Sequence, residues 1–265
     1  MSQSYLDAVV HSSRPAMPLS GRAEQALPFT VRVVSGRSAL MKAVQIRQAA
    51  YGRHLPEFAQ TLGAPEALDL RPGVAVLLAE SKLDGAPLGT MRIQTNRFQP
   101  LALEQSITLP ASLASRPLAE AARLGVTGQR VGRMVKTVLF KAFFQYCQQA
   151  GIEWMVIAGR APIDRQYERL LFDDVYPDAG YIPLRHAGNL PHRVMSFEVG
   201  SAEQRWAAAG HPLYDFIFRT VHPDIDLDQG HDSAAASAAF RQARVQSRMQ
   251  LRHGGRGMRQ DKLAA

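Results

Sequence analysis

The sequence contains one cysteine, Cys147, among its 265 residues. A single cysteine excludes a disulfide framework, makes a cysteine-rich metal site implausible and suits a reducing compartment. The eight histidines show no metal-ligand spacing, and Cys147 falls inside an expected helix without a partner motif. We therefore expect neither a metal site nor a thiol nucleophile.

Long apolar runs are also missing. No stretch of about 18 consecutive apolar residues is available to cross a bilayer, and the N-terminus lacks the apolar segment of an export signal. We therefore expect a soluble, cytoplasmic protein with no membrane span. With 46% apolar residues, a chain of this length can bury one sizeable core or two small ones.

The formal net charge of +8 is concentrated near the C-terminus. Residues 231–265 hold seven Lys or Arg and two Asp, a net of +5, which leaves +3 for the preceding 230 residues. Arginines recur there every three or four residues, at Arg241, Arg244, Arg248 and Arg252. They would line one face of a helix. A solvated tail and a tail that contacts nucleic acid both fit this pattern, but the interleaved aromatics of a single-strand binder are missing, so nucleic acid is not the expected partner.

The composition divides the chain into three parts. Residues 1–27 mix Ser, Pro, Ala and scattered charges without a period, which predicts a flexible N-terminal arm. Residues 28–230 form the expected folded domain. Residues 231–265 form the expected basic tail, partly disordered or helical.

Apolar periodicity predicts alternating strands and helices within residues 28–230. Strands are expected at Phe29–Val34, Val74–Glu80, Leu88–Gln94, Leu118–Val126, Trp154–Ala158 and Arg193–Val199. Helices are expected at Ser38–Tyr51, Val131–Ala150, Ile163–Phe172 and Ala202–Val221. Asp84-Gly85 is typical of a hairpin turn. This order predicts one mixed α/β sheet covered by helices.

The most informative segment runs from Glu120 to Ala150. Apolar Leu124-Gly125-Val126 leads into Gln129-Arg130-Val131-Gly132-Arg133 and then into a long amphipathic helix. Backbone amides at such a turn, followed by a helix N-terminus, can hold the phosphate of an acyl carrier arm. The segment therefore indicates an acyl-transfer site.

The Gln129-x-x-Gly132 turn and the order of elements resemble the GNAT acyltransferase superfamily, whose signature is Arg/Gln-x-x-Gly-x-Gly/Ala. Further motifs resemble the N-acyl amino acid synthases, which are relatives of the acyl-homoserine-lactone synthases. These motifs are Ile46-Arg47-x-x-x-Tyr51, Gly89-Thr90-Met91-Arg92, Glu120-x-x-Arg123-Leu124-x-Val126, Tyr167-x-Arg169-Leu170-x-Phe172, Ala209-Gly210-His211-Pro212 and His222-Pro223-Asp224-Ile225-Asp226-Leu227. The resemblance implies a mixed, mostly antiparallel sheet flanked by helices.

The resemblance also assigns the donor-binding residues. Leu124 and Val126 would pair with the thioester arm, on a strand that diverges from its neighbour, and a backbone N–H there would stabilise the oxyanion. The phosphate would rest on Gln129, Arg130, Gly132 and Arg133. Met134 stands where the signature has Gly or Ala and should crowd a pyrophosphate, which favours acyl carrier protein over coenzyme A as donor.

Attack by a primary amine on a thioester requires a base, because the amine is mostly protonated at neutral pH. Glu120 is the candidate base, and Glu120 with Arg123 matches a pair in the related synthases; otherwise Glu120 is a rim carboxylate. Strand alternation places Glu120 on the face opposite Arg123 unless the strand bulges. Tyr167 matches the hydroxyl that protonates the leaving thiolate, or is a core aromatic.

Two further sets of basic residues have candidate roles. Arg92 would bind the acceptor carboxylate through a bidentate fork, or would stabilise the sheet edge. Arg130, Arg133, Lys136 and Lys141 could receive an acidic carrier protein, or could form a solvated helix face.

The sequence thus predicts a GNAT-like N-acyltransferase that moves a fatty acyl group from acyl carrier protein to the amino group of a small acceptor, without a metal or other cofactor. The expected acceptor is an amino acid. One alternative is an acyl-homoserine-lactone synthase that consumes S-adenosylmethionine. Against it, Trp154 and Trp206 both lie outside the N-terminal third, where those synthases typically carry Trp. The other alternative is a non-catalytic acyl- or nucleic-acid-binding protein with the same fold.

Overall fold

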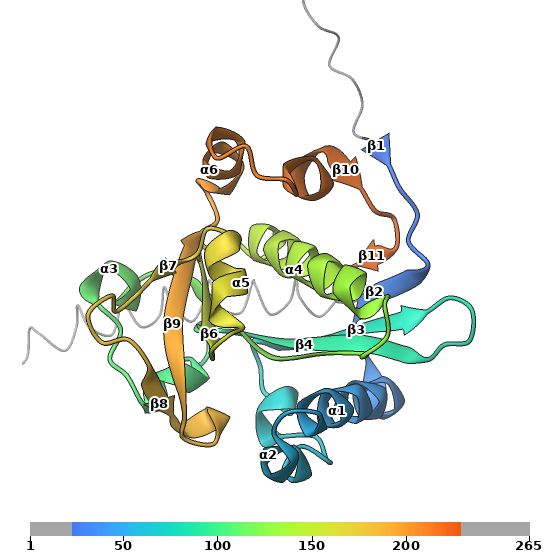
Figure 1. The fold of residues 1–265 in the computed structure, drawn as a ribbon, viewed down its shortest axis with the longest axis horizontal. Helices are drawn as coiled ribbons and strands as arrows, with labels where there is room; N and C mark the ends of the chain where they lie inside the picture. Colours follow the sequence, from blue (N-terminus) through green and yellow to red (C-terminus); the bar gives the residue numbers. More distant parts are fainter. Residues whose placement is uncertain (1–22, 229–265) are drawn as a thin grey trace, which may run out of the picture.

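A nine-stranded sheet lies at the centre of the computed structural model, which describes residues 23–228 (Figure 1). The strand order is β11-β2-β3-β4-β5-β6-β9-β7, and β8 pairs with β9. Neighbouring strands are antiparallel except for the parallel pairs β11–β2 and β5–β6. The predicted mixed, mostly antiparallel sheet is therefore confirmed.

The strands are β1 Ala23–Glu24, β2 Phe29–Val33, β3 Val74–Ser81, β4 Pro87–Thr95, β5 Leu118–Val126, β6 Trp154–Gly159, β7 Asp173–Asp174, β8 Ile182–Leu184, β9 Leu190–Glu198, β10 Thr220–Val221 and β11 Ile225–Asp226. The α-helices are α1 Gly36–Gly52, α2 Pro56–Gln60, α3 Ala111–Ala114, α4 Gly132–Gln149, α5 Asp164–Arg169 and α6 Ala202–Ala208. Short 3₁₀ turns η1 to η3 span Ala67–Leu70, Ala102–Gln105 and Arg185–Ala187, and a π-helical turn η4 spans Asp215–Arg219.

Helices cover both faces of the sheet (Figure 1). Helices α1 and α2 lie on one face and α4 and α5 on the other, while α6 and the chain up to β10 pack over α4. Helix α4 buries Val135, Val138, Leu139, Ala142 and Phe143 at helical spacing, as predicted. No helix among residues 23–228 is long and apolar enough to cross a membrane.

Two glycines allow the helices to approach the sheet closely. A Cβ placed on Gly89 of β4 would lie 2.5 Å from Val135 Cγ1 of α4. A Cβ placed on Gly125 of β5 would lie 3.0 Å from Ala50 Cβ of α1. Side chains at these positions would push α4 and α1 away from opposite faces of the sheet, because the packed interior has no room for them.

The predicted helix Ala202–Val221 is wrong beyond its first two turns. The helix ends at Ala208, the chain turns at Gly210 with a φ of 56°, and Pro212 follows. Proline and left-handed glycine both end an α-helix, so the segment continues instead as the π-helical turn and β10.

The folded part begins before the predicted boundary at residue 27. Ala23–Glu24 of β1 pairs in parallel with Thr220–Val221 of β10, and Leu27 is buried. Residues 23–27 therefore belong to the domain and correct that boundary. Residues 1–22 of the predicted arm and the predicted tail 231–265 lie outside the described residues.

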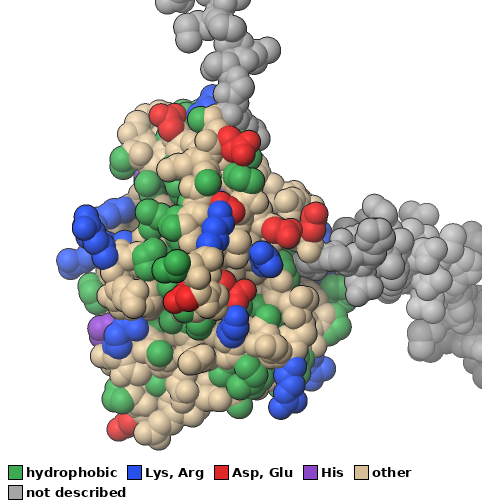
Figure 2. Space-filling view, turned by 90° about the vertical axis from the view of Figure 1, so that its right-hand side faces the viewer, with side chains coloured by type: hydrophobic (Ala, Val, Ile, Leu, Met, Phe, Trp, Pro, Cys, Tyr) green, Lys and Arg blue, Asp and Glu red, His purple; other side chains and the backbone are tan. Residues whose placement is uncertain are grey.

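Asp224 connects the segment before β11 to strand β2 and to residues near its start. Its carbonyl accepts the Val31 N–H at 2.8 Å, and its carboxylate accepts the Leu27 N–H at 2.7 Å and pairs with Lys82 at 2.6 Å. Figure 2 shows this side of the molecule, with basic side chains mainly at the margins and both signs of charge near the middle. The outer edge of β2 is thus paired with the backbone of β11, and charged side chains of both signs lie beside it.

Lys141 is fully buried, so its predicted place in an exposed docking cluster is wrong. Its ammonium donates to the Phe216 carbonyl at 2.6 Å and the Thr220 carbonyl at 2.5 Å, and lies 2.8 Å from His222 Nδ1. Burial and the neighbouring ammonium lower the pKa of His222 to about 4. The ring is therefore neutral at pH 7, and its Nδ1 accepts a hydrogen bond from the Lys141 ammonium. Lys141 therefore joins α4 to the segment that leads into β10.

We predict that Lys141→Ala lowers the free energy of unfolding by about 3 kcal/mol, because two carbonyls and an imidazole nitrogen lose a buried charged donor. Urea denaturation measures the change. Lys42→Ala is the control, since Lys42 is a half-exposed partner of Glu80 and should change stability by about 1 kcal/mol or less. Equal, small effects for both variants would contradict a role for Lys141 in holding the segment.

Candidate functional site

Strands β5 and β6 separate halfway along their length. They pair only from Leu118 opposite Trp154 to Ala121 opposite Ile157. Beyond that point β5 continues to Val126 and β6 to Gly159 without pairing to each other. The divergence expected beside Leu124 and Val126 is therefore present, and it leaves backbone groups of β5 open toward the gap.

A bulge in β5 lies at the start of this gap. On β4, Thr90 pairs with Gly125 and Arg92 pairs with Ala122, so one residue of β4 faces two of β5. Arg123, within the bulge, has a φ of 55°. That left-handed conformation is unusual for a residue other than glycine and costs of order 1 kcal/mol or more. The surrounding contacts must therefore hold it.

The bulge also overturns the predicted alternation of side chains. Glu120 and Arg123 were expected on opposite faces, but both side chains reach His186 of η3: the Glu120 carboxylate lies 3.1 Å from its Nε2, and Arg123 donates to its carbonyl at 2.7 Å. An extra residue in the strand reverses the side-chain pattern that follows it. Glu120 and Arg123 therefore lie on the same face of the sheet, without a direct contact between them.

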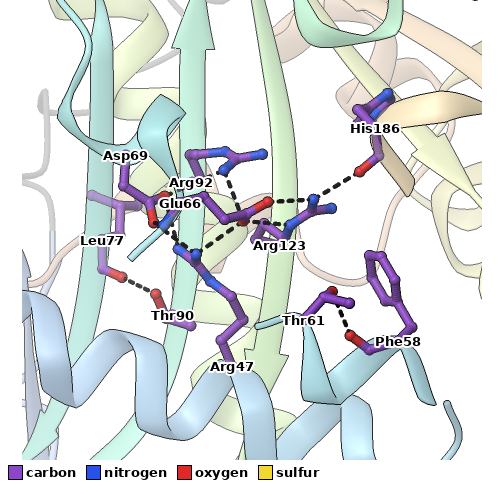
Figure 3. Close-up of polar contacts among 10 residues, drawn as sticks. All are labelled: Arg47, Phe58, Thr61, Glu66, Asp69, Leu77, Thr90, Arg92, Arg123 and His186. Carbon is purple, nitrogen blue, oxygen red and sulfur yellow. Dashed lines mark hydrogen bonds and ion pairs between the residues drawn. The ribbon is translucent and has the colours of Figure 1, made fainter. Parts of the chain in front are cut away.

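Three arginines and two carboxylates form a buried cluster on the face covered by α1 and α2 (Figure 3). Glu66 accepts two hydrogen bonds from Arg123, both at 2.7 Å, and one each from Arg92 at 2.9 Å and Arg47 at 3.1 Å. Asp69 accepts two from Arg47, at 2.9 and 3.1 Å, and one from Arg92 at 3.3 Å. The cluster therefore carries one positive charge in excess.

The arginines keep both carboxylates ionised. Burial alone would raise the pKa of Glu66 and of Asp69, but the hydrogen bonds and charges of the arginines outweigh it and hold both pKa values below their ordinary range. Arg47 Nε is buried without a hydrogen-bond partner among the described residues. The cluster is thus fully charged, and its donors exceed its acceptors.

The candidate residues Glu120 and Arg92 are both deeply buried, at 1% and 2% exposure. Glu120 Oε2 accepts the Leu103 N–H at 3.1 Å, whereas Oε1 lies 3.1 Å from His186 Nε2 and has no hydrogen-bond partner among the described residues. The Arg92 guanidinium is bonded to Glu66 and Asp69. Arg92 therefore contributes to the excess positive charge and does not present a free fork.

Tyr167 lies where β6 ends. A Cβ placed on Gly159 would lie 2.8 Å from Tyr167 Cδ2, and the ring packs against Phe140 and Phe172 at centroid distances of 5.6 and 6.2 Å. Burial, with a smaller contribution from Tyr51, raises the pKa of Tyr167 well above its ordinary value. Its hydroxyl therefore stays protonated at neutral pH and has no hydrogen-bond partner within residues 23–228.

The predicted phosphate turn is present at the start of α4. Gly132 donates to the Gln129 carbonyl at 2.9 Å, and a Cβ placed on Gly132 would lie 2.2 Å from the Thr127 carbonyl oxygen, so only glycine fits the turn. Within the described chain, the amides of Arg130 and Arg133 donate to no protein group. Both side chains are exposed. The turn can therefore offer amides and positive charge to an anion.

Leu124 and Val126, the residues expected beside the thioester arm, are partly buried against the main core. The Val126 carbonyl accepts a hydrogen bond from Arg53 Nη2 at 2.6 Å, which ties the end of β5 to the end of α1. Met134 is 47% exposed in the first turn of α4.

An apolar pocket of about 370 Å³ lies on the α4 and α5 face of the sheet. Its walls come from α4, α5, β6, β9, α6 and the π-helical turn, and its rim carries Lys136, Gln166 and Arg169. The wall residues include Phe140, Phe144, Met155, Phe172, Phe197, Ala202, Trp206, Ile217 and Phe218. Phe140 and Phe172 also contact Tyr167, so the pocket adjoins the gap between β5 and β6.

Sequence reasoning missed Glu66, Asp69 and His186. All three lie in short 3₁₀ turns or next to them, where no apolar period marks the chain. A charge argument could have found the first two: buried Arg47 and Arg92 require carboxylates, and Glu66-x-x-Asp69 lies between their helix and strand in the sequence.

Comparison with known proteins gave matches among solved structures. No family model matches the sequence, and no curated protein matches it. The chain is similar to FeeM, an N-acyl amino acid synthase from uncultured soil microbes, with a TM-score of 0.51 and 17% identity over 68% of this chain and 96% of that one. It is also similar to BjaI, a CoA-dependent acyl-homoserine lactone synthase, with a TM-score of 0.51 and 15% identity over 80% of this chain and 99% of that one.

The chain shares the fold of these two synthases. A second BjaI structure, with SAM and isopentyl-CoA, gives a TM-score of 0.50 at 15% identity, again over 80% of this chain and 99% of that one. The mixed, mostly antiparallel sheet flanked by helices that the motifs led us to expect is therefore the fold of this chain. The match spans almost the whole of each synthase.

We predict that Glu66→Gln lowers the free energy of unfolding by about 2 to 3 kcal/mol, because three buried arginines would then share one carboxylate. Urea denaturation measures the loss. Glu57→Gln, an exposed change on α2, is the matched control and should stay within about 0.5 kcal/mol. Indistinguishable curves for the two variants would show that Glu66 does not hold the cluster together.

Proposed function

We propose that the protein is an N-acyltransferase that moves a fatty acyl group from a thioester to the amino group of a small anionic acceptor, such as an amino acid. The observation that carries the proposal is the gap between β5 and β6. An anion-binding turn and an apolar pocket lie on one face of the sheet at this gap, and a positively charged cluster lies on the other. A thioester and an amine could meet there from opposite faces.

The donor side suits a pantetheine arm with an acyl chain. The free amides at the start of α4 would hold the arm's phosphate, and the unpaired part of β5 would accept its amide groups as an added strand. The pocket beside Tyr167 is lined by aromatic and aliphatic side chains. Such walls favour a fatty acyl chain over an acetyl group, because burying each methylene contributes about 0.8 kcal/mol.

The acceptor side suits a carboxylate. Arg47, Arg92 and Arg123 are balanced by only Glu66 and Asp69. An acceptor that brings one negative charge would neutralise the cluster. Free amino acids meet this requirement, and so does the amino acid moiety of S-adenosylmethionine. The lactone synthase reaction is therefore the second candidate, and the similarity to BjaI favours it to the same degree as the similarity to FeeM favours the first.

The reaction requires three groups from the protein: a base, a hydrogen-bond donor to the oxyanion and a proton donor to the thiolate. The acceptor ammonium loses a proton to a base, and the free amine attacks the thioester carbon. A backbone N–H of β5 beside the bulge stabilises the oxyanion while the new C–N bond forms. The C–S bond then breaks, the protonated Tyr167 hydroxyl can give its proton to the thiolate, and the second N–H proton of the acylated nitrogen returns to the Tyr167 oxygen. Glu120 is the carboxylate proposed to drive the first step.

Acyl carrier protein is the donor we propose. Arg130 and Arg133 are exposed at the turn where the arm's phosphate would rest, and an acidic carrier would meet them there. The chain is also similar to a CoA-dependent synthase, so the two donors must be compared directly.

Arg130→Glu with Arg133→Glu should raise KM for an acyl carrier substrate several-fold more than KM for an acyl-CoA of the same chain length.

Incubation of the protein with acyl carrier thioesters or acyl-CoAs, in the presence of pooled amino acids or of S-adenosylmethionine, tests the proposal when products are identified by mass spectrometry. An N-acyl amino acid is the expected product. An acyl-homoserine lactone would instead establish the second candidate. Absence of any amide product with every donor and acceptor pair would refute acyl transfer.

We predict that Ala202→Phe shifts donor preference toward shorter chains, because Ala202 is buried in the pocket wall and the added ring fills part of its volume. The ratio of kcat/KM for a long over a short acyl donor should fall at least about tenfold, equivalent to roughly two methylenes of lost burial. Ala207→Phe, exposed on the same helix, should leave that ratio unchanged. An unchanged ratio in Ala202→Phe would mean that the acyl chain lies elsewhere.

A further inference from the structure

His186 is the residue through which Glu120 meets the rest of the site. Its Nε2 lies 3.1 Å from Glu120 Oε1, at ion-pair distance. Its carbonyl accepts the Arg123 hydrogen bond that helps to hold the bulge (Figure 3). One residue of η3 is therefore fixed both by the candidate base and by the arginine at the start of the gap.

Glu120 is poorly placed to take a proton from a substrate amine by itself. Its Oε2 is bonded to the Leu103 N–H, and its Oε1 faces His186 Nε2, so both oxygens lie against groups of the protein. A buried carboxylate next to an imidazole has a different use: it fixes which ring nitrogen carries the proton and stabilises the ring when it becomes charged. Glu120 Oε1 lies 3.1 Å from Nε2 and has no hydrogen-bond partner among the described residues, so a proton on Nε2 would satisfy it.

The other ring nitrogen of His186 is unoccupied. Nδ1 is buried and has no hydrogen-bond partner within residues 23–228. With the proton on Nε2, Nδ1 carries a lone pair and can accept a proton. A buried polar atom left unpaired costs about 1 to 3 kcal/mol, so its presence calls for an explanation such as a catalytic role.

We propose that His186 Nδ1 is the base that accepts the proton of the acceptor amine, and that Glu120 is a positioning residue that acts through His186. This inference rests on the proposed function. The ammonium N–H bond breaks as its proton moves to Nδ1, and the amine electron pair then forms the bond to the thioester carbon. The C–S bond breaks with its electrons on sulfur, and the thiolate takes a proton from Tyr167 or from the imidazolium. The second N–H proton of the acylated nitrogen then moves to the group that gave its proton to sulfur, and the imidazolium releases the remaining proton to solvent.

Several charged groups set the environment of His186. Glu120 and Arg123 reach it from β5, His192 lies nearby on β9, and Glu104 belongs to η2, which packs against η3. Glu104 is engaged with the Leu101 N–H, and Arg123 with Glu66. Glu120 is therefore the carboxylate that lies next to the His186 ring.

The test compares His186→Gln with His192→Gln. Glutamine can keep a donor near Glu120 but has no base at the Nδ1 position. His186→Gln should lower kcat by about 100- to 10,000-fold, with little change in KM, and should change the pH dependence of kcat/KM. The loss should shrink for acceptors whose amine is already neutral at the assay pH. The His192→Gln control should keep the wild-type pH profile.

A second measurement does not depend on activity. NMR of ¹⁵N-histidine-labelled protein, assigned by comparison with His186→Gln, should show His186 with its proton on Nε2, and Glu120→Gln should weaken that preference. A proton on Nδ1 in the wild-type protein, or a His186→Gln variant with the wild-type pH profile and a loss in kcat below about tenfold, would overturn the proposal. Failure of the wild-type protein to transfer acyl groups would instead refute the proposed function, while the tautomer would still be measurable.

Discussion

The two hydrogen bonds from Arg123 to Glu66 are the interaction on which the site depends. Arg123 has a backbone conformation that glycine would adopt more easily, and its side chain is what holds that conformation in place. The same bulge turns Arg123 onto the face of Glu120 and lies where β5 parts from β6. Loss of the Glu66 contact would therefore affect the gap as well as the charge cluster.

The two faces of the sheet differ in chemical character on either side of the gap. The face of α4 and α5 offers an apolar pocket and an exposed, cationic helix start. The face of α1 and α2 offers buried arginines and the pair of Glu120 with His186. A continuous sheet would keep these regions apart, because paired strands leave no passage between them. In the proposed reaction, a thioester and an amine would meet where these two strands diverge.

The regular elements could be predicted from the sequence because their signals are local. The boundaries of β5 agree with the prediction at both ends, and α4 agrees to within one residue. The helix expected to reach Val221 fails where Gly210 and Pro212 interrupt the pattern. These two residues were visible in the sequence, but the surrounding apolar residues outweighed them in the prediction.

The site itself was only partly predictable. Glu120, Arg123, Tyr167 and the turn at Gly132 could be chosen because motifs mark them, but Glu66 and His186 lie in turns without a motif, and their roles come from contacts 57 and 63 residues away in sequence. Strand alternation gave the wrong face for Arg123, because a bulge with a left-handed arginine leaves no glycine as a signal. Long-range pairing and backbone strain are properties of the folded chain.

The pairing of β11 with β2 has a consequence for how the chain is made. Within the described residues, the outer edge of β2 is covered by Ile225–Asp226 of β11, which are translated long after Phe29–Val33. Until the ribosome has released that late segment, the nascent sheet presents a bare apolar border that can template association with another chain. The sheet among residues 23–228 is therefore completed only when this late segment is in place.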